Sequence, residues 1–357
     1  MKDDLDIPRR LNRYRQFYQA ADNGWFLIIT TFPGKADLIS FDLRTFDFTR
    51  QSEHQRYWDG LVEQAFYCIE DHIGVDDDWI PGIVLHYGFG AFGMVYADAA
   101  LTFTEDTCYM ESVLPDWSQK EKFAYSPDRF WSQIFIQAAH YLSEKGYGCF
   151  MVDSYPNPSP LDVVNLLRGN LLFTDFYEYP ETLTAFLKQV TEWVIENAKM
   201  VYGAMHHAWE GRLTFNAWIP DGILLLEDAA DLCSPAVYRK FGFPYTRQVL
   251  HEMGGGYIHH HSLGRQQYRN MASLDDLYVL QISSDPAATR PLSELPYLFE
   301  QVGNKPVDLE CTVDEIVHQI DQLRKGRAIL RASCENKEEA QWLVRFVREK
   351  SKKFNPA

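Results

Sequence analysis

The sequence predicts an α/β fold of the TIM (β/α)8 barrel type, formed as one domain over residues 1–357. Short apolar runs typical of buried strands alternate with amphipathic helical segments, so the strands should be parallel and joined by helical crossovers. About eight such strands fit a barrel better than an open sheet. The first strand also lacks the Gly-x-Gly-x-x-Gly turn of a dinucleotide-binding sheet, so no nucleotide cofactor is expected.

The first part of the chain is predicted to hold an N-terminal helical extension, two strands and a hairpin. The extension covers residues 1–24, with its helix from about Pro8 to Ala21. The elements that follow, in order, are a strand at Trp25–Phe32, a helix at Arg50–Ile73, a strand at Gly82–Gly88 and a hairpin-bearing excursion at Met94–Trp117.

Later in the chain, strands and helices alternate more regularly. Ser126-Pro127 and Ser234-Pro235 each place an N-cap residue before a proline at the first helical position, which predicts two helix starts. The first helix should end near Gly146, and Pro244 should kink or split the second. The predicted strands are 147–154, 213–218, 257–261, 277–283, 306–310 and 327–333. The other predicted helices are 181–209, a short one after the histidine run, 292–302, 312–326 and 336–350.

The composition limits the possible partners and location. The formal net charge of −16 argues against nucleic acid and anionic membranes as main partners. The N-terminal residues lack the apolar core of a signal peptide, and no later run is long enough for a membrane span. Six cysteines are scattered without Cys-x-x-Cys pairs, which is typical of the reduced thiols of a cytoplasmic protein. The expected partner is a small-molecule substrate.

Polar and titratable residues recur where the predicted strands of the second half end. Because the carboxyl ends of barrel strands meet at one face, where catalysis takes place, these residues should converge there. They are Asn216-Ala217-Trp218 with Asp221, then His259-His260-His261, Ser283-Ser284-Asp285, Glu310-Cys311 and Ser333-Cys334-Glu335.

The histidine run is the clearest candidate for a metal site. Strand alternation places His259 and His261 on one face and His260 on the other. If the shared face is the barrel interior, two imidazoles point into its mouth, where Cys334 and Glu310 from neighbouring strand ends could complete a zinc site. The alternative is that one histidine is hydrogen-bonded in the rim and the others are solvated.

Other residues are weaker candidates, and each has a structural alternative. Arg168 could clamp a substrate carboxylate or form a structural salt bridge. Asp153 could bind substrate or cap a turn, and His86 could line the pocket or pack in the core. Trp218 is a further substrate-binding candidate at a strand end. Glu227, Asp228 and Asp231 precede Ser234, where some of them should serve the helix amino end. His206 and His207 are predicted to lie on a helix surface.

Three segments resemble the uroporphyrinogen decarboxylase family. LEDAADLCSPAVYRKFGFPYTRQVLHEMGGGYIHHHSLG is similar to the central segment of that family, in which an acidic residue precedes a Ser-Pro helix start and a strand ends in His-x-Cys-Gly. PLDVVNLLRGNLLFTDFYEYPETLTAFLKQVTEWVIENAK and ILRASCEN are similar to an upstream helical segment and to the final strand with its cysteine. The resemblance extends from about Pro158 to the end, and it implies a TIM barrel and homodimerisation.

The resemblance favours one of the two branches of the family. The decarboxylases bind a polycarboxylate tetrapyrrole through an arginine-rich motif after the first strand, but this chain has no arginine between Arg15 and Arg44. The other branch transfers methyl groups between a corrinoid protein and an acceptor such as a thiol, with zinc held by a histidine and cysteines. By that resemblance His261 matches the family histidine and Cys334 the late cysteine, whereas Leu263 occupies the position of the other cysteine.

The resemblance therefore implies a methyltransferase-like enzyme that moves a methyl group between a corrinoid protein and a zinc-activated acceptor. His259 could replace the missing cysteine, with Glu310 or Cys311 as a further ligand. His261, Asp228 and Asp285 are the expected catalytic residues, and Arg168 would help to orient the ligands. Two alternatives stay open: a metal-free decarboxylase (lyase) acting on a tetrapyrrole or a small carboxylate, and a barrel that only binds a corrinoid or tetrapyrrole.

Overall fold

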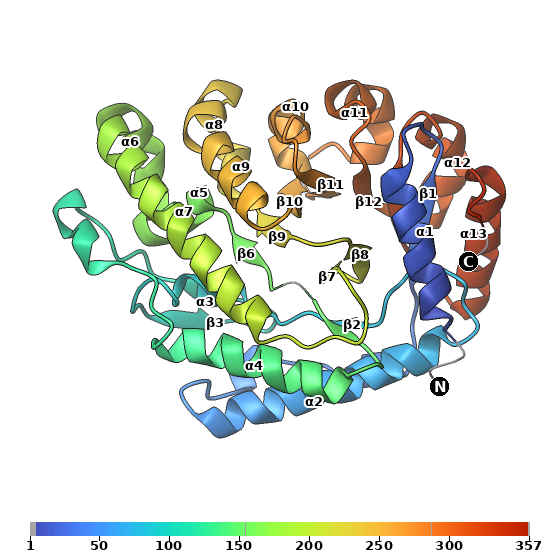
Figure 1. Ribbon diagram of the computed structural model, residues 1–357, viewed down its shortest axis with the longest axis horizontal. Coiled ribbons are helices and arrows are strands. Elements are labelled where there is room, and N and C mark those ends of the chain that lie inside the picture. The colour runs from blue at the N-terminus through green and yellow to red at the C-terminus, as the bar shows by residue number, and fades with distance from the viewer. Residues whose placement is uncertain (1–4, 154, 287, 356–357) are drawn as a thin grey trace.

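The structure, a computed structural model, describes residues 5–153, 155–286 and 288–355. Residues 1–4 of the predicted extension and Ser154 of a predicted strand lie outside these ranges. The protein has an α/β fold built on a parallel sheet of seven strands, which confirms the α/β class of the predicted fold (Figure 1). In spatial order the strands are β1 (Phe26–Thr31), β13 (Ala328–Ser333), β12 (Val307–Thr312), β11 (Leu277–Ser283), β10 (Gly256–His261), β9 (Ile223–Leu226) and β6 (Asn157–Pro158).

Three two-stranded sheets accompany the large sheet. β2 (Gly82–Ile83) and β5 (Met151–Val152) pair in parallel. β3 (Leu101–Phe103) and β4 (Cys108–Met110) form an antiparallel hairpin, which confirms the predicted excursion. β7 (Arg212–Thr214) and β8 (Ala217–Ile219) form a second antiparallel hairpin.

The β7–β8 hairpin corrects one prediction. Residues 213–218 were expected to form one strand of the parallel sheet, but the chain reverses at Phe215 and Asn216, whose φ angles are 48° and 62°. Two consecutive residues with positive φ make the tight turn that joins antiparallel strands. The parallel strand is instead the apolar run β9, whose four residues are all buried. Glu227 and Asp228 therefore directly follow a strand of the large sheet.

Helices surround the sheet. The α-helices are α1 (Ile7–Gln19), α2 (Gln51–His72), α3 (Phe89–Gly93), α4 (Phe130–Gly146), α5 (Pro160–Arg168), α6 (Leu172–Glu178), α7 (Pro180–Gly203), α8 (Pro235–Phe241), α9 (Phe243–Glu252), α10 (Tyr268–Ala272), α11 (Leu295–Val302), α12 (Val313–Leu323) and α13 (Lys337–Lys350). The 3-10 helices are η1 (Lys35–Leu38), η2 (Leu43–Thr45), η3 (Trp117–Lys122), η4 (Gly169–Leu171), η5 (Ala229–Leu232), η6 (Ser262–Gln267) and η7 (Pro291–Glu294). Among the described residues, no helix is long and apolar enough to cross a membrane.

Capping explains where several helices begin. Ser234 caps α8 through its side chain, and Pro244 separates α8 from α9, as predicted. Ser126-Pro127 does not start a helix: the Ser126 side chain accepts the backbone N–H of Asp128 at 3.3 Å in a turn, and α4 begins only at Phe130. α7 ends at Gly203, so His206 and His207 follow that helix rather than lie on it.

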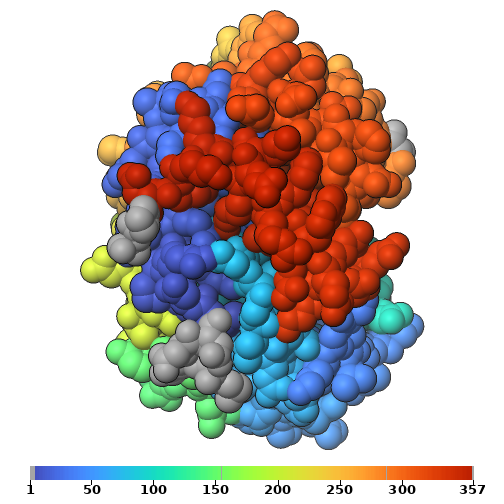
Figure 2. Space-filling view, turned by 90° about the vertical axis from the view of Figure 1, so that its right-hand side faces the viewer, coloured from blue at the N-terminus to red at the C-terminus, as the bar shows by residue number. Residues whose placement is uncertain are grey.

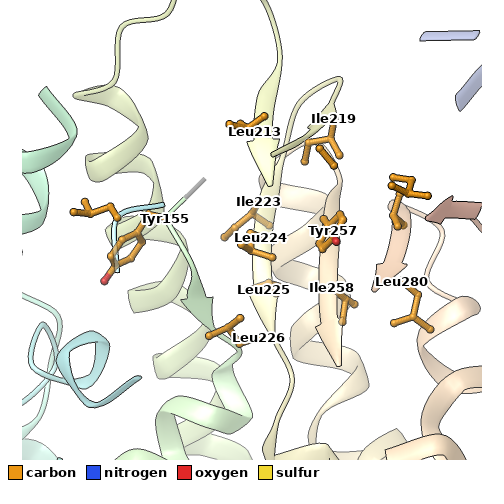
Figure 3. Packing of buried hydrophobic residues seen from close by; sticks show 14 of the residues in the cluster. Tyr155, Leu213, Ile219, Ile223, Leu224, Leu225, Leu226, Tyr257, Ile258 and Leu280 are labelled. Atoms are coloured by element: carbon orange, nitrogen blue, oxygen red, sulfur yellow. The ribbon is translucent and has the colours of Figure 1, made fainter. Parts of the chain in front are cut away.

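Apolar side chains fill the space within the sheet and between the sheet and its helices. Figure 3 shows this packing where β9 and β10 run side by side, with Leu224 beside Tyr257 and Leu225 near Ile258. These four side chains are fully buried. Burial of these side chains anchors the two strands beside each other, and their parallel register brings their carboxyl ends to the same edge of the sheet.

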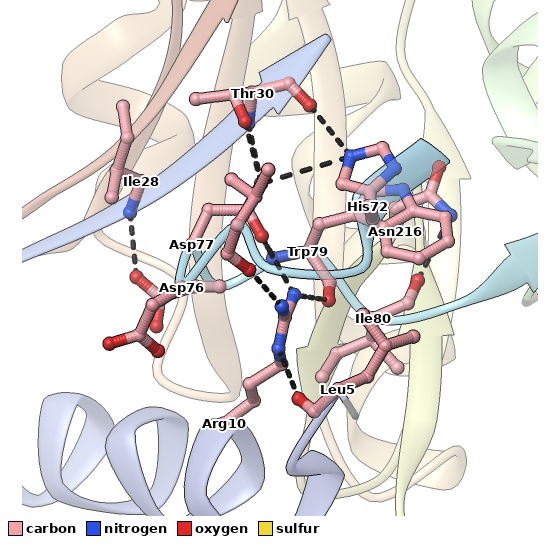
Figure 4. A network of polar contacts seen from close by, with 12 residues as sticks. Leu5, Arg10, Ile28, Thr30, His72, Asp76, Asp77, Trp79, Ile80 and Asn216 are labelled. Atoms are coloured by element: carbon pink, nitrogen blue, oxygen red, sulfur yellow. Dashed lines mark hydrogen bonds and ion pairs between the residues drawn. The ribbon is translucent and has the colours of Figure 1, made fainter. Parts of the chain in front are cut away.

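Buried ion pairs join the beginning of the chain to the segment before β2. The Arg10 guanidinium donates to Asp77 at 2.7 Å and to the carbonyls of Val75 and Trp79 at 2.5 Å each. Asp77 in turn accepts from the backbone N–H of Thr30 in β1 at 3.0 Å (Figure 4). Figure 2 shows a dark-blue segment from early in the chain, a light-blue segment and the red C-terminal segment side by side on one face, in line with the ion pairs of Asp78 with Arg13 and Arg348.

Gly222 sets the start of β9 and provides a test of this geometry. Its φ is +106°, and a Cβ there would lie 2.2 Å from the carbonyl oxygen of Gly255. Gly222→Ala should therefore lower the free energy of unfolding by at least about 2 kcal/mol, measured by urea denaturation. Gly203→Ala is the matched control, because nothing lies within 4 Å of that position. It should be neutral or stabilise the protein by up to about 1 kcal/mol, and equal effects of both changes would contradict the prediction.

Candidate metal centre

The candidate centre forms where β9 and β10 end side by side. In the register of the two strands His259 lies opposite Leu226, and the backbone N–H of Glu227 donates to the His259 carbonyl at 3.0 Å. The next residue, Asp228, is thereby carried to the same edge of the sheet as His259 and His261. In a parallel sheet, ligands bind outside the carboxyl ends of the strands.

Asp228, His259 and His261 bring three potential metal donors together. The Nε2 atoms of the two histidines are 3.2 Å apart, and Asp228 Oδ1 lies 3.4 Å from His261 Nε2 and 4.0 Å from His259 Nε2. Within the described residues, this is the one group of three or more His, Cys, Asp or Glu donors that all lie within 4.8 Å of one another. Two ligands of a tetrahedral zinc, each about 2.1 Å from the ion, are about 3.4 Å apart, so the spacing fits.

The protonation of the three residues depends on their mutual contacts. A hydrogen bond with Asp228 raises the pKa of His261 to about 9, against the opposing effect of burial. Burial lowers the pKa of His259, although the negative charge of Asp228 partly opposes this shift. Burial alone would raise the pKa of Asp228, but the neighbouring histidines hold it below its ordinary value. The metal-free cluster thus pairs a cationic His261 with an anionic Asp228, and a cation would take the place of that proton.

Both histidines are oriented by acceptors on the side away from the cluster. His261 Nδ1 lies 2.9 Å from Asp285 Oδ1, and His259 Nδ1 contacts Gln281 Oε1. With Nδ1–H donated in this way, Nε2 of each ring faces the cluster, and His261 would offer a lone pair there once its Nε2 proton is lost. Outer partners of this kind set the tautomer and the direction of a ligating imidazole.

Both outer partners, Asp285 and Gln281, are fixed by further hydrogen bonds. Asp285 Oδ2 accepts the backbone N–H of Leu263 at 2.8 Å and the Ser262 hydroxyl at 3.1 Å. Gln281 donates to Ser283 Oγ at 3.0 Å, and that hydroxyl donates to Glu310 Oε1 at 3.1 Å. Glu310 therefore lies at the end of a hydrogen-bonded chain that leads to His259, rather than in the donor cluster.

His260 points to the other side of β10, as strand alternation predicts. Its ring is fully buried, and Nδ1 and Nε2 lie 2.9 Å from the carbonyls of Glu227 and Gly264. This histidine joins the end of β9 to η6 and supports the edge on which the cluster stands.

The loop that carries Asp228 is held from behind by a buried carboxylate. Asp162, in the first turn of α5, accepts the backbone N–H groups of Asp228 at 3.0 Å and Ala229 at 2.7 Å. Glu227 accepts from the hydroxyl of Tyr238 at 3.1 Å and also from that of Thr246. These contacts fix the backbone on both sides of the Asp228 side chain.

The structure does not bring the two predicted cysteine candidates into the cluster. Cys334 is the residue after β13, and its Sγ has a carbonyl, that of Ala332, at 4.0 Å. Its pKa is raised to about 12, chiefly by burial and then by Glu339 and Asp77. Cys311 Sγ lies 3.2 Å from the carbonyl of Leu309. Among the described residues neither cysteine belongs to the donor group, so metal binding by Cys334 stays an untested prediction.

Four further predicted residues lie outside the cluster. Arg168 is buried, and its guanidinium donates to both carboxylate oxygens of Asp175 and to the Leu114 carbonyl, each at 2.7 Å. All three guanidinium nitrogens are thus bonded within the protein, which matches the structural salt bridge that was the alternative for this residue. Trp218, in the β7–β8 hairpin, is buried near Tyr14 and Tyr18.

The other two predicted residues, His86 and Asp153, lie in different environments. The His86 ring packs on Phe92 with its centroid 6.1 Å away, and burial lowers its pKa. Burial also raises the pKa of Asp153 to about 8, and the carboxyl accepts the backbone N–H of Asn216 at 3.3 Å.

Sequence reasoning missed Asp162 and Gln281, and both leave a signal in the sequence. Gln281 interrupts an otherwise apolar strand, two residues before Ser283 on the same face. Asp162 lies three residues after the N-cap Ser159 and two after Pro160, a position at which an acidic residue normally serves its own helix. Here it also reaches the next strand–helix loop.

The comparisons with known proteins support the fold. The chain matches no protein-family model and no curated protein. Among solved structures it is similar to a methyltransferase from Methanosarcina mazei, with a TM-score of 0.65 and 14% sequence identity. The similarity covers 96% of this chain and 98% of that one. At this identity the similarity establishes a shared fold over nearly the whole of both chains.

Proposed function

We propose that this protein is a zinc-dependent, methyltransferase-like enzyme of the uroporphyrinogen decarboxylase superfamily, with Asp228, His259 and His261 as metal ligands. The observation that carries the proposal is the close approach of these three donors at the carboxyl ends of β9 and β10. The fold shared with a methyltransferase supports the reaction class.

The donor set fits a catalytic zinc. Two imidazoles and one carboxylate leave a fourth tetrahedral position open for a substrate atom. The three side chains are between 16% and 36% exposed, so a small acceptor can reach them. When bound, zinc would act as a Lewis acid that lowers the pKa of an acceptor thiol, so that the nucleophilic thiolate forms at neutral pH.

The residues around the ligands would prepare this chemistry without taking part in bond changes. Asp285 and Gln281 hold the imidazoles in one orientation, and Asp162 holds the loop of Asp228. In the transfer itself the acceptor sulfur forms a bond to the methyl carbon, and the bond between that carbon and its donor breaks with the electron pair leaving on the donor. A corrinoid protein is the donor that the family resemblance suggests.

We infer in addition that the sheet closes into a (β/α)8 barrel. Between the edge strands β1 and β6, the backbone N–H of Asp78 donates to the Ile28 carbonyl at 2.6 Å, and that of Asp153 donates to the Ile83 carbonyl at 2.7 Å. Together with the β2–β5 pair, these bonds support one further strand position, that of β2, between β1 and the segment that holds β5 and β6. Counted in this way, the sheet would have eight strand positions in all.

Methyl transfer to a thiol tests the proposed function. Zinc-loaded protein would be incubated with methylcobalamin as the methyl donor and a panel of small thiols, and the methyl thioether would be measured by mass spectrometry. We expect product with the wild type and with His251→Ala, an exposed histidine outside the cluster, and none with His261→Ala. A wild-type protein that holds about one zinc per chain but makes no product above the enzyme-free level would overturn the methyltransferase proposal.

A further inference from the structure

The turn of the β7–β8 hairpin is held in a costly backbone conformation next to the candidate centre. Phe215 and Asn216 both have left-handed φ angles, which suit glycine and cost a residue with a side chain about 1 kcal/mol or more. Phe215 is a bulky residue that rarely adopts this conformation. Such a conformation persists only where the surroundings fix it.

Contacts from two segments of the chain fix this turn, and a third segment supports one of these contacts. The Phe215 carbonyl accepts a hydrogen bond from Arg331 of β13, and Asp308 of β12 holds that guanidinium at 2.6 and 2.7 Å. Asn216 Nδ2 donates to the Ile80 carbonyl at 3.0 Å, and the Ile80 N–H donates to the Asn216 carbonyl at 3.0 Å. Figure 4 shows Asn216 and Ile80 facing each other beside the buried ionic network.

The turn places the Phe215 ring against the ligand strand β10. Its centroid lies 5.8 Å from that of the His259 imidazole, at an interplanar angle of 61°, and 6.1 Å from that of Tyr257, at 64°. Tyr257 is fixed in turn by its hydroxyl, which donates to Asp308 at 2.8 Å. Edge-to-face contacts of this kind restrict the orientation of both rings.

We propose that Phe215 is a positioning residue for the metal ligand His259, and that the strained turn serves to deliver its ring. The proposal rests on the proposed metal centre. It adds a residue that has no metal-binding atom and so is not part of the donor group. Gln281 fixes the Nδ1 side of the imidazole by a hydrogen bond, but rotation about that bond would still move Nε2. The Phe215 ring restricts this rotation, so that Nε2 stays directed at Asp228 and His261.

The zinc dissociation constant of Phe215→Leu tests the proposal, measured by competition with a chromophoric chelator. Leucine keeps apolar volume but removes the planar ring, and we expect zinc affinity to fall by about 10- to 100-fold, as for other changes behind a metal ligand. Asn216→Gly is the matched control in the same turn. Glycine accepts positive φ without strain. The variant loses the Nδ2 bond to Ile80 but keeps the Phe215 ring and the bonds that the carbonyls of residues 215 and 216 accept. If the ring positions His259, the zinc affinity of this variant should equal that of the wild type.

A spectroscopic measurement separates positioning from a general loss of stability. Cobalt-substituted protein should show altered visible absorption bands in Phe215→Leu and unaltered bands in Asn216→Gly, because these bands report the arrangement of the ligands. Far-UV circular dichroism would establish that both variants are folded, and Phe215→Tyr, which keeps the ring, would replace Phe215→Leu if that variant did not fold; its affinity should then match the wild type.

The outcomes distinguish this proposal from the one on which it rests. Equal zinc affinity and equal cobalt spectra in wild type and Phe215→Leu would overturn the role of Phe215 and leave the metal centre intact. The same role would be overturned if Phe215→Tyr bound zinc at least tenfold more weakly than the wild type while still folded. A wild type that binds no zinc would overturn both proposals.

Discussion

Asp228→Ala should abolish stoichiometric zinc binding, whereas Cys334→Ala should leave it unchanged. Structural zinc in four-ligand sites is bound with about 10–16 kcal/mol, so one ligand contributes about 3 kcal/mol, or more than a hundredfold in affinity. Removing Asp228 would leave two neutral imidazoles and no charge to balance the cation. Cys334 lies outside the donor group, and its raised pKa opposes the thiolate that zinc requires.

Metal content measured by mass spectrometry, on untagged protein purified without added metal, would decide between these ligand sets. Asp228→Asn refines the comparison because it keeps the size of the side chain and one oxygen donor but removes the charge. We expect its affinity to lie between those of the wild type and Asp228→Ala. Loss of zinc in Cys334→Ala together with its retention in Asp228→Ala would show that the cysteine, and not the carboxylate, is the third ligand.

The position of Leu263 bears on why the proposed zinc site would use a carboxylate where the family that the chain resembles uses a cysteine thiolate. Leu263 stands where the resemblance places a cysteine, but its side chain is 51% exposed, and its backbone N–H holds Asp285. In the proposed site, Asp228, which follows the neighbouring strand β9, would supply the ligand that is missing there. A hard oxygen donor in place of a soft sulfur still suits zinc, which binds both.

Part of this site could be predicted from the sequence because strand alternation is a local property. Three consecutive histidines at a strand end must divide between two faces, and the structure confirms that His259 and His261 share one of them. Strand alternation also applies at the end of β13. The Ser333 hydroxyl bonds to that of Thr31, whereas the next residue, Cys334, lies near Glu339 and Asp77. Both its place at a predicted strand end and the family resemblance had suggested that Cys334 was a ligand.

Asp228 was predicted as a catalytic residue but not as a metal ligand, because two β-rich runs compete within a short stretch. Leu213–Trp218 and Ile223–Leu226 have similar propensities, and only tertiary pairing decides which one joins the large sheet. Once Phe215 and Asn216 turn the first run into a hairpin, the second becomes the strand beside β10. The carboxylates after it then change from helix-capping residues into candidates for the metal site.

The largest effect on stability is expected at Asp78, which binds two arginines inside the protein. Its Oδ1 pairs with Arg13 at 2.5 Å and its Oδ2 with Arg348 of α13 at 2.7 Å, while Oδ2 also accepts the backbone N–H of Ile28 at 2.8 Å. The carboxylate thus joins α1, β1 and α13. Asp78→Ala would leave two guanidinium groups without this partner.

Asp78→Ala should lower the free energy of unfolding by about 3–5 kcal/mol, measured by urea denaturation at pH 7, because removing one member of a buried ion pair leaves the opposite charge buried without that partner. Asp76→Ala is the matched control: Asp76 pairs with Arg13 at 3.0 Å, but its side chain is 52% exposed, so the loss should stay below about 1 kcal/mol. Equal losses would contradict the argument.

The pH dependence of the same variant gives an independent check. Burial alone would raise the pKa of Asp78, but Arg13 and Arg348 outweigh it and hold the pKa below its ordinary value. A carboxylate with a lowered pKa stabilises the fold above its pKa in the unfolded chain, about 3.9, and loses that contribution as the pH falls through its lower pKa in the folded protein. The difference in stability between wild type and Asp78→Ala should therefore be constant from pH 5 to 7, an interval about one unit or more above that value. It should shrink below about pH 4, and a difference that grew on acidification would show that the carboxylate is not the stabilising form.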